Sequence, residues 1–164
     1  MHGRISGEAT WRRVRRVAKG AVPAAGAAPT ITVPGGKLWT PLSAIATVVT
    51  SAVAGSRAIA LGITVANVEV ARQGCGNDAA ESVTFTASWW PYANSSGTTT
   101  QGVSGLPIIP LPAGSTVALS VTGGDAGDQW SALSLYVIEE DEQSGPIDLR
   151  EAFGMILDRL PNEA

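Results

Sequence analysis

Apolar and polar residues alternate along several segments in the middle of the chain, and this period of two is typical of strands with one buried face. The clearest segment spans residues 57–66, where Ile59, Leu61 and Ile63 alternate with small or polar residues. Glycine, proline and asparagine separate the segments, and no helical period interrupts them. The predicted strands are residues 31–34, 38–50, 57–66, 68–72, 83–90, 103–109, 116–122 and 133–138. This spacing predicts an all-β fold, an antiparallel β-sandwich or jelly-roll of about eight strands.

Both ends of the chain show a helical period instead. Residues 6–18 place tryptophan and valine on one side of a helix and arginines on the other, which predicts a basic N-terminal arm or short helix. Near the other end, residues 148–151 form a variant of the helix capping box and Pro161 ends the pattern, which predicts a short C-terminal helix. Its apolar face consists of Leu149, Phe153, Ile156 and Leu160. This face needs a surface to dock on, either the chain's own sandwich or a partner.

Charge divides the chain into similar parts. Residues 1–20 carry six cationic side chains and one acid, whereas residues 139–164 carry eight acids and two arginines. We therefore predict three regions: a basic arm with an Ala/Gly/Pro linker (1–28), the β-sandwich (29–140), and an acidic linker with the amphipathic helix (141–164). The paired arginines before Ala21–Ala28 also resemble, in a weaker form, a twin-arginine export signal.

The middle of the chain is unusually poor in charge. Charged residues make up 15% of the whole chain, against roughly 25% in soluble domains. Between Ser82 and Gly124 the only ionisable side chain is that of Tyr92. Serine, threonine and four prolines in this stretch argue against a membrane span, and the uncharged stretch 38–56 is also too rich in hydroxyl residues. Since charge keeps isolated domains apart, this pattern predicts a domain that other subunits cover, with no membrane involved.

The chain offers little for catalysis. One cysteine, Cys75, excludes an intrachain disulfide and a four-cysteine metal site, and the one histidine is His2. Because Ser-His-Asp, Cys-His and histidine–metal mechanisms need an ordered imidazole, we assign no catalytic residue, metal or cofactor. Asp125 and Asp128 lie in a glycine-rich turn and offer the oxygen ligands that calcium favours, but their spacing does not match an EF-hand. We interpret them as solvated turn residues, and Cys75 as an incidental thiol.

Two features indicate binding surfaces. Successive strand residues face opposite sides, so Trp89 is predicted to point inward and Trp90 outward, near Tyr92. The outward aromatic residues fit an interface between subunits, a stacked sugar ring or packing beneath a loop. The second feature is a basic run that we predict to anchor the chain to a partner: Trp11, Arg12, Arg13, Val14, Arg15 and Arg16. Its favoured partners are protein acids, in this chain, a neighbouring subunit or a shell, ahead of the phosphates of a nucleic acid.

Four stretches resemble small β-sandwich virion accessory proteins of tailed bacteriophages, of the capsid decoration (cement) or head-fibre type: Ile31–Trp39, Thr50–Arg57, Leu111–Ser115 and Leu135–Glu140. In such proteins the sandwich is displayed on the particle, often as a trimer, and a terminal arm secures it to the major capsid protein. The resemblance implies a non-enzymatic protein on the capsid surface that stabilises the head, with the major capsid protein and copies of itself as partners. Residues 1–19 would then be the anchor, and residues 91–105 an exposed or intersubunit feature.

Other roles stay open at this point. Trp90 and Tyr92 also fit a glycan-binding module of a head fibre, spike or tail. A tail or connector component, or a shell-forming jelly-roll whose basic arm contacts nucleic acid, uses the same kind of fold. If residues 1–19 are the anchor, deleting them is expected to abolish particle binding and to leave a folded domain.

Overall fold

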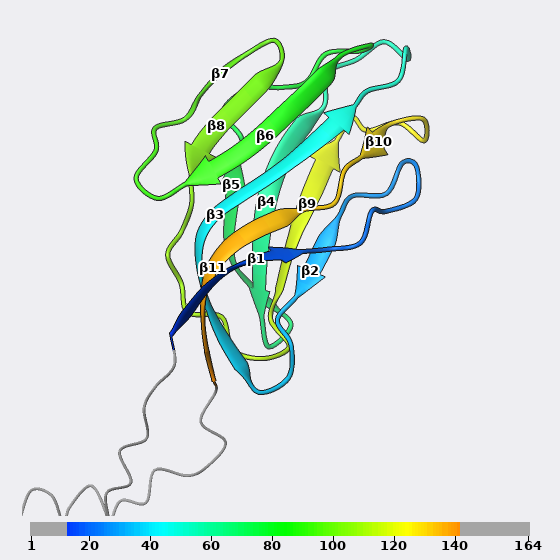
Figure 1. The fold of residues 1–164 in the computed structure, drawn as a ribbon. Helices are drawn as coiled ribbons and strands as arrows, with labels where there is room; N and C mark the ends of the chain where they lie inside the picture. The colour runs from blue at the N-terminus through cyan, green and yellow to red at the C-terminus, as the bar shows by residue number, and fades with distance from the viewer. Residues whose placement is uncertain (1–12, 142–164) are drawn as a thin grey trace, which may run out of the picture.

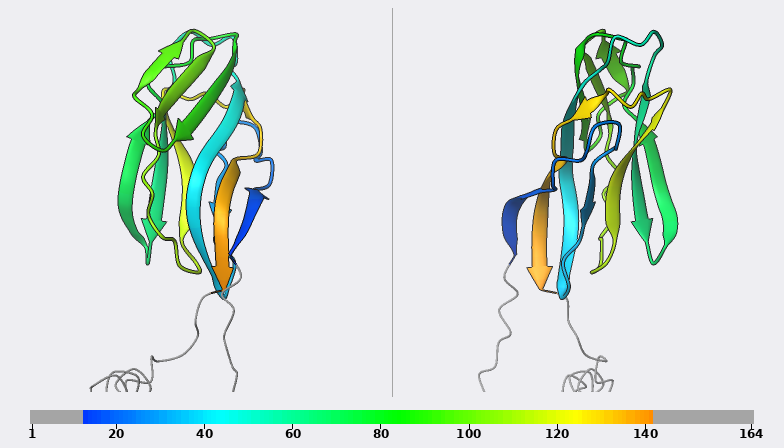
Figure 2. Two further views of the ribbon diagram at one scale, coloured as in Figure 1. Left: turned by 60° about the vertical axis from the view of Figure 1, so that its left-hand side comes forward. Right: turned by 90° about the vertical axis from the view of Figure 1, so that its right-hand side faces the viewer.

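The computed structural model describes residues 13–141, and within this range it contains eleven β-strands and no helix (Figure 1). The strands are β1 (Val14–Lys19), β2 (Thr30–Thr32), β3 (Lys37–Val49), β4 (Ala58–Val65), β5 (Val68–Gly74), β6 (Thr84–Trp90), β7 (Ser96–Thr98), β8 (Gln101–Gly105), β9 (Thr116–Thr122), β10 (Gln129–Trp130) and β11 (Ser134–Asp141). They form a seven-stranded and a four-stranded sheet, which lie in two layers (Figure 2). The all-β sandwich predicted from the alternating pattern is confirmed.

The larger sheet has the order β1-β11-β3-β6-β8-β7, with β10 beside β3, and the smaller sheet has the order β2-β9-β4-β5. The neighbouring strands are antiparallel except for β6 and β8, which run parallel. This exception to the predicted antiparallel pattern arises because β7 reverses the chain and pairs with the outer side of β8. The start of β1 and the end of β11 lie at the same end of the sandwich, where Val14 is opposite Glu139 (Figure 1).

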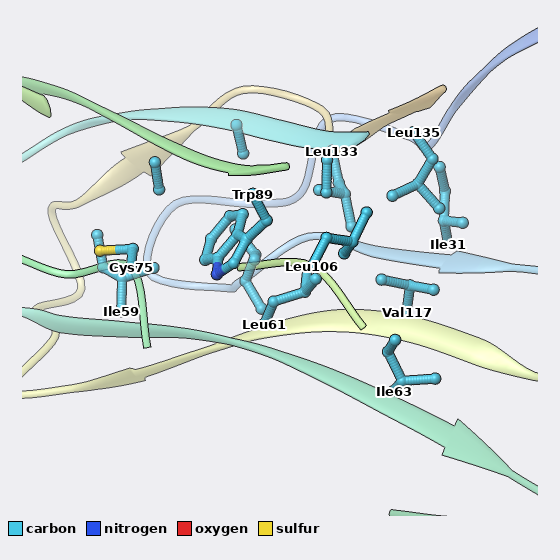
Figure 3. Close-up of a cluster of buried hydrophobic side chains, with 14 of the residues drawn as sticks. Ile31, Ile59, Leu61, Ile63, Cys75, Trp89, Leu106, Val117, Leu133 and Leu135 are labelled. Atoms are coloured by element: carbon cyan, nitrogen blue, oxygen red, sulfur yellow. The ribbon is translucent and has the colours of Figure 1, made fainter. Parts of the chain in front are cut away.

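The core lies between the two sheets and follows the predicted period of two. Ile59, Leu61 and Ile63 on β4 are buried, and so is Trp89 on β6. In Figure 3 the indole of Trp89 and the side chain of Leu133 face Leu61 and other aliphatic side chains of the opposite layer. Full burial of one such side chain contributes roughly 1.5–3 kcal/mol. The alternation therefore fixes which face of each long strand points into the core.

The predicted helix over residues 6–18 is wrong for its described part, because residues 14–19 form β1. A short isolated helix is marginal in water, whereas the edge of β11 supplies backbone partners along six residue pairs. The strands β7 and β10 were also not predicted, because they are short and carry no alternating apolar pattern. β8 ends at Gly105 rather than residue 109. The predicted C-terminal helix lies outside the described residues.

The β7–β8 hairpin packs closely against the turn that follows β5. A Cβ atom added to Gly102 would lie 2.5 Å from the carbonyl oxygen of Cys75 and 2.9 Å from its Sγ atom. The amide of Asn77 donates a hydrogen bond of 2.5 Å to the carbonyl oxygen of Thr98. The Cys75 thiol is buried and donates to the carbonyl oxygen of Asn77, and burial raises its pKa. A buried thiol with a raised pKa is a weak nucleophile, so this cysteine has a packing role.

Candidate interaction surface

Complementary charges join the basic strand β1 to the acidic end of β11. The guanidinium of Arg16 donates a hydrogen bond of 2.9 Å to Oε2 of Glu139, and Arg13 forms an ion pair with Glu140. The indole N–H of Trp39 donates to the same Glu139 oxygen at 2.8 Å. Exposed ion pairs usually contribute about 0–1 kcal/mol each, but Glu139 is largely buried and links three strands. Two of the predicted anchor arginines are therefore occupied by acids of their own chain.

Lys37 extends this charge network along β3. Its Nζ atom lies 2.5 Å from Oδ1 of Asp141 and 3.7 Å from Oε1 of Glu139. The hydrogen bond to Asp141 and the nearby carboxylates raise the pKa of Lys37. The network gathers the charges at the end of the sandwich where β1 starts and β11 ends.

Arg15 and Lys19 are different from the other cations of β1. Both side chains are exposed, and neither forms an ion pair with a residue in the range 13–141. Ala18 is buried and points into the sandwich, so Arg15, Val17 and Lys19 point outward. Val17, which lies between the two cations, is 63% exposed. β1 thus presents a short outward row of two cations and one apolar side chain.

Beyond this row, the outward face of the larger sheet carries no charge along its central strands except at Glu140, near the end of β11, which pairs with Arg13. The inward positions of β3, β6 and β11 are buried, which places the intervening residues on the outer face. Those outward residues include Ile45, Thr47 and Val49 on β3, Thr84, Thr86, Ser88 and Trp90 on β6, and Ser134, Tyr136 and Ile138 on β11. Four large apolar side chains among them are exposed: Ile45, Val49, Trp90 and Tyr136. We call this surface the uncharged face.

Trp90 is the last residue of β6, and Tyr92 lies in the turn that follows. Trp89 is fully buried and Trp90 is 47% exposed, which confirms the predicted directions of these two neighbours. The carbonyl oxygen of Trp90 accepts hydrogen bonds from the backbone of Leu106 at 2.9 Å and of Ala93 at 3.2 Å. Tyr92 is 92% exposed and has a φ of 62°, a left-handed conformation that bulky residues seldom adopt. The backbone therefore holds a strained turn from which the phenol projects into solvent.

The interpretation of Asp128 as a solvated turn residue is wrong, because Asp128 is buried and pairs with Arg57. The Nε and Nη2 atoms of Arg57 each lie 3.2 Å from a different Asp128 oxygen. Nη1 of Arg57 donates to the carbonyl oxygens of Val53 and Gly55, and Nη2 also donates to Ser51 Oγ. All five N–H donors of a guanidinium are thus satisfied beneath the surface.

The carboxylate of Asp128 is held just as firmly. It accepts hydrogen bonds of 2.9 Å from the backbone N–H groups of Ser51 and Asp125. Burial would raise the pKa of Asp128, but these N–H groups and the guanidinium outweigh it and lower the pKa. Asp125 accepts from the N–H of Gly127, which lowers its pKa, so the turn itself uses both acids. The sequence contained one signal of this contact. Arg57 and the two acids Asp125 and Asp128 are isolated charges within otherwise uncharged stretches.

The hollows on the described part of the surface include two of similar size. One, of about 620 Å³, is lined mostly by small residues and includes Asp125 and Asp128, whose roles in the turn are described above. The other, of about 570 Å³, includes Arg72, which makes two hydrogen bonds to the carboxylate of Glu69. Within residues 13–141 there is no group of three or more side chains able to hold a metal ion, and no helix long enough to cross a membrane.

The structure places only part of the predicted binding residues. Val14, Arg15 and Arg16 lie on β1 and Arg13 directly precedes it, but Trp11 and Arg12 lie outside the described residues. The predicted docking face of the C-terminal helix also lies outside them: Leu149, Phe153, Ile156 and Leu160. The charge pattern indicated a basic run, but not that part of it would form a strand edge.

Comparisons with known proteins give little further guidance. No protein-family model matches the chain, and no curated protein matches it. Among solved structures, one similar chain comes from the crystal structure of the T13 viral particle of IBDV, with a TM-score of 0.35 and 14% sequence identity. The similarity covers 80% of this chain and 36% of that chain, so this chain spans about a third of its length. A likeness at this level assigns neither a common fold nor a common role.

Proposed function

We propose that this protein is a non-enzymatic structural component of a virus particle, a capsid decoration (cement) protein on the head of a tailed bacteriophage. The observation that carries the proposal is the uncharged face, with the exposed side chains Ile45, Val49, Trp90 and Tyr136. A broad surface of this kind is typical of a protein interface, where charges are depleted and aromatic residues enriched. The resemblance of residues 31–140 to phage virion proteins supports the same role.

The proposed mechanism needs no chemistry beyond binding. Subunits that bind only the assembled shell shift the equilibrium toward the intact shell by mass action. The uncharged face would contact a neighbouring copy or the shell. Arg15 and Lys19 beside it, which form no ion pair with any other described residue, suit an acidic patch on that partner. The rigid sandwich would then bridge capsid subunits on the outer surface.

The structure changes how the anchor must be tested. Deleting residues 1–19 would remove β1 and leave β11 as a new exposed edge, so lost binding could reflect a damaged sheet. A double substitution on the uncharged face, Ile45→Glu with Tyr136→Glu, leaves every strand in place. The matched control is Val68→Glu with Val70→Glu. It adds the same two negative charges at exposed positions of β5, an edge strand of the other sheet.

The decisive measurement is a density map of virus particles from an infected culture that produces the chain. We expect sandwich-shaped density at regular positions on the head, lost or reduced with the Ile45/Tyr136 variant and unchanged with the control. Particles that lack the chain, or that carry it only in the tail, contradict the proposal.

A glycan-binding module is the second candidate, because Tyr92 projects from a strained turn near the exposed Trp90. Exposed aromatic rings of this kind can stack on the apolar face of a sugar. Binding on a glycan array that disappears in Trp90→Ala, with normal occupancy on the particle, would favour this role over the first.

A further inference from the structure

Within the described residues, β1 forms an open edge of the larger sheet. The ends of the two strand orders are β1, β7, β2 and β5, and the two-residue β10 pairs with β3 alone. β2 and β7 have three residues each, whereas β1 has six and β5 has seven. The end of β5 is engaged by the larger sheet, because Trp89 Nε1 donates to the carbonyl oxygen of Gln73. Within residues 13–141, β1 pairs with β11 on one side and with no strand on the other.

The register of β1 shows which backbone groups face this open edge. The N–H of Gly20 donates to the carbonyl oxygen of Leu133 at 2.9 Å, one step beyond the pair Lys19 and Ser134. In an antiparallel ladder, hydrogen-bonded pairs alternate with pairs whose backbone groups point the other way. The N–H and C=O groups of Arg15, Val17 and Lys19 therefore point away from β11. No strand within residues 13–141 lies there to receive them.

The side chains of Arg15 and Lys19 favour a particular kind of strand at this edge of β1. Arg15 and Lys19 are exposed and form no ion pair within the described range, so an added strand would lie beside two free cations. Pairing β1 with β1 of a second copy would bring like charges together. The repulsion between such charges is a usual way in which edge strands avoid self-association. An acidic strand has the complementary charge.

The opposite edge of β1 already holds such a strand. There β11 forms the backbone ladder and supplies Glu139 to Arg16 and Glu140 to Arg13. The sequence of β11 combines apolar residues with consecutive acids at its end. The inner edge thus shows that β1 is compatible with an acidic, extended partner in antiparallel pairing.

We propose that the free edge of β1 binds an acidic, extended segment of a partner protein by β-strand addition. The segment pairs with the outward N–H and C=O groups of Arg15, Val17 and Lys19, and its carboxylates lie beside the cationic side chains of Arg15 and Lys19. Backbone hydrogen bonds supply a general affinity and the two cations supply the preference for acids. This inference concerns the mode of binding and goes beyond the proposed virion role.

The test uses the full chain and a fluorescein-labelled peptide of about eight residues in which glutamate and valine alternate. Fluorescence anisotropy should show saturable binding, and NMR should show slower amide exchange at Arg15, Val17 and Lys19 when the peptide is bound. Val17→Pro removes the central outward N–H and no hydrogen bond to β11, so it should raise the Kd at least about tenfold while the thermal midpoint stays close to that of the unmodified chain.

Two further arms separate strand addition from simple charge attraction. Arg15→Gln with Lys19→Gln should also raise the Kd at least about tenfold, whereas the control Val68→Glu with Val70→Glu, with the same change in net charge, should leave it unchanged. A peptide with N-methylated backbone amides keeps its charge but loses its donors, and it should not bind. This peptide keeps the test valid even where Val17→Pro fails to fold.

Three results would overturn the proposal. The first is no saturable binding of the acidic peptide at millimolar concentration. The second is binding of the N-methylated peptide with the same Kd as the unmodified peptide, or binding of the unmodified peptide by Val17→Pro with the same Kd as by the unmodified chain. Either outcome would show attraction by charge alone. The third is self-association in the ultracentrifuge that Val17→Pro removes, which would assign the edge to a second copy. Each leaves the particle experiment standing, because that experiment depends on Ile45 and Tyr136.

Discussion

Replacing Asp128 with asparagine tests whether its ion pair with Arg57 fixes the loops at one end of the sandwich. The substitution keeps the shape of the side chain and removes its charge. The guanidinium of Arg57 is only 1% exposed and would lose its counter-charge. The amide nitrogen would also place N–H donors at one of the two oxygen positions, which now accept bonds from Ser51 and Asp125. Two loops far apart in the sequence would lose the contact that holds them together.

The expected loss of stability is large for one atom-for-atom replacement. Removing one partner of a buried pair costs about 3–5 kcal/mol, and we expect about 3 kcal/mol because this pair lies beneath surface loops. Domains of this size unfold with a free energy of about 5–15 kcal/mol. With a urea dependence of about 1–3 kcal/mol per molar, the unfolding midpoint should fall by roughly 1–3 M.

The assay is urea unfolding at neutral pH followed by tryptophan fluorescence. Asp125→Asn is the matched control, since it lies in the same turn and does not pair with Arg57, and its midpoint should stay close to that of the unmodified chain. The reasoning fails if Asp128→Asn unfolds within about 1 kcal/mol of the unmodified chain, a difference typical of surface substitutions.

Lowering the pH provides a second test of the ion pair between Arg57 and Asp128. The folded state lowers the pKa of Asp128 below its value of about 3.9 in an unfolded chain. Its contribution is therefore fully present above about pH 4 and is lost as the pH falls through the lower folded value. The stability difference between the unmodified chain and Asp128→Asn should shrink over that acidic range, and a constant difference would refute the electrostatic explanation.

Two further predictions use neighbouring or matched positions within the sheets. Trp89→Ala should cost about 3–5 kcal/mol because it empties a fully buried site, whereas Trp90→Ala next to it should cost less than about 1 kcal/mol in the same urea assay. Gly102→Ala should cost about 1–3 kcal/mol because its Cβ would collide with backbone atoms of Cys75, whereas Gly35→Ala, with nothing within 4 Å, should unfold at nearly the original midpoint.

Most of the fold was predictable because the long strands bury one face each. A period of two along residues 57–66 or 83–90 reports the side that meets the core, so the directions of Trp89 and Trp90 followed from their positions alone. The charge-poor composition likewise indicated a surface without charges. Strand β1 was different, because its valines and arginines fit a helical period as well as an edge strand.

The amino-acid sequence by itself determined the class of fold, the inward face of each long strand and the shortage of charge on the central surface, because these depend on local alternation and composition. Only the tertiary structure decided that β1 joins β11, which acids occupy Arg13 and Arg16, and that Arg57 finds Asp128 at a separation of 71 residues. Those outcomes depend on which strands become neighbours. That choice is set by packing across the whole sandwich, and no local pattern records it.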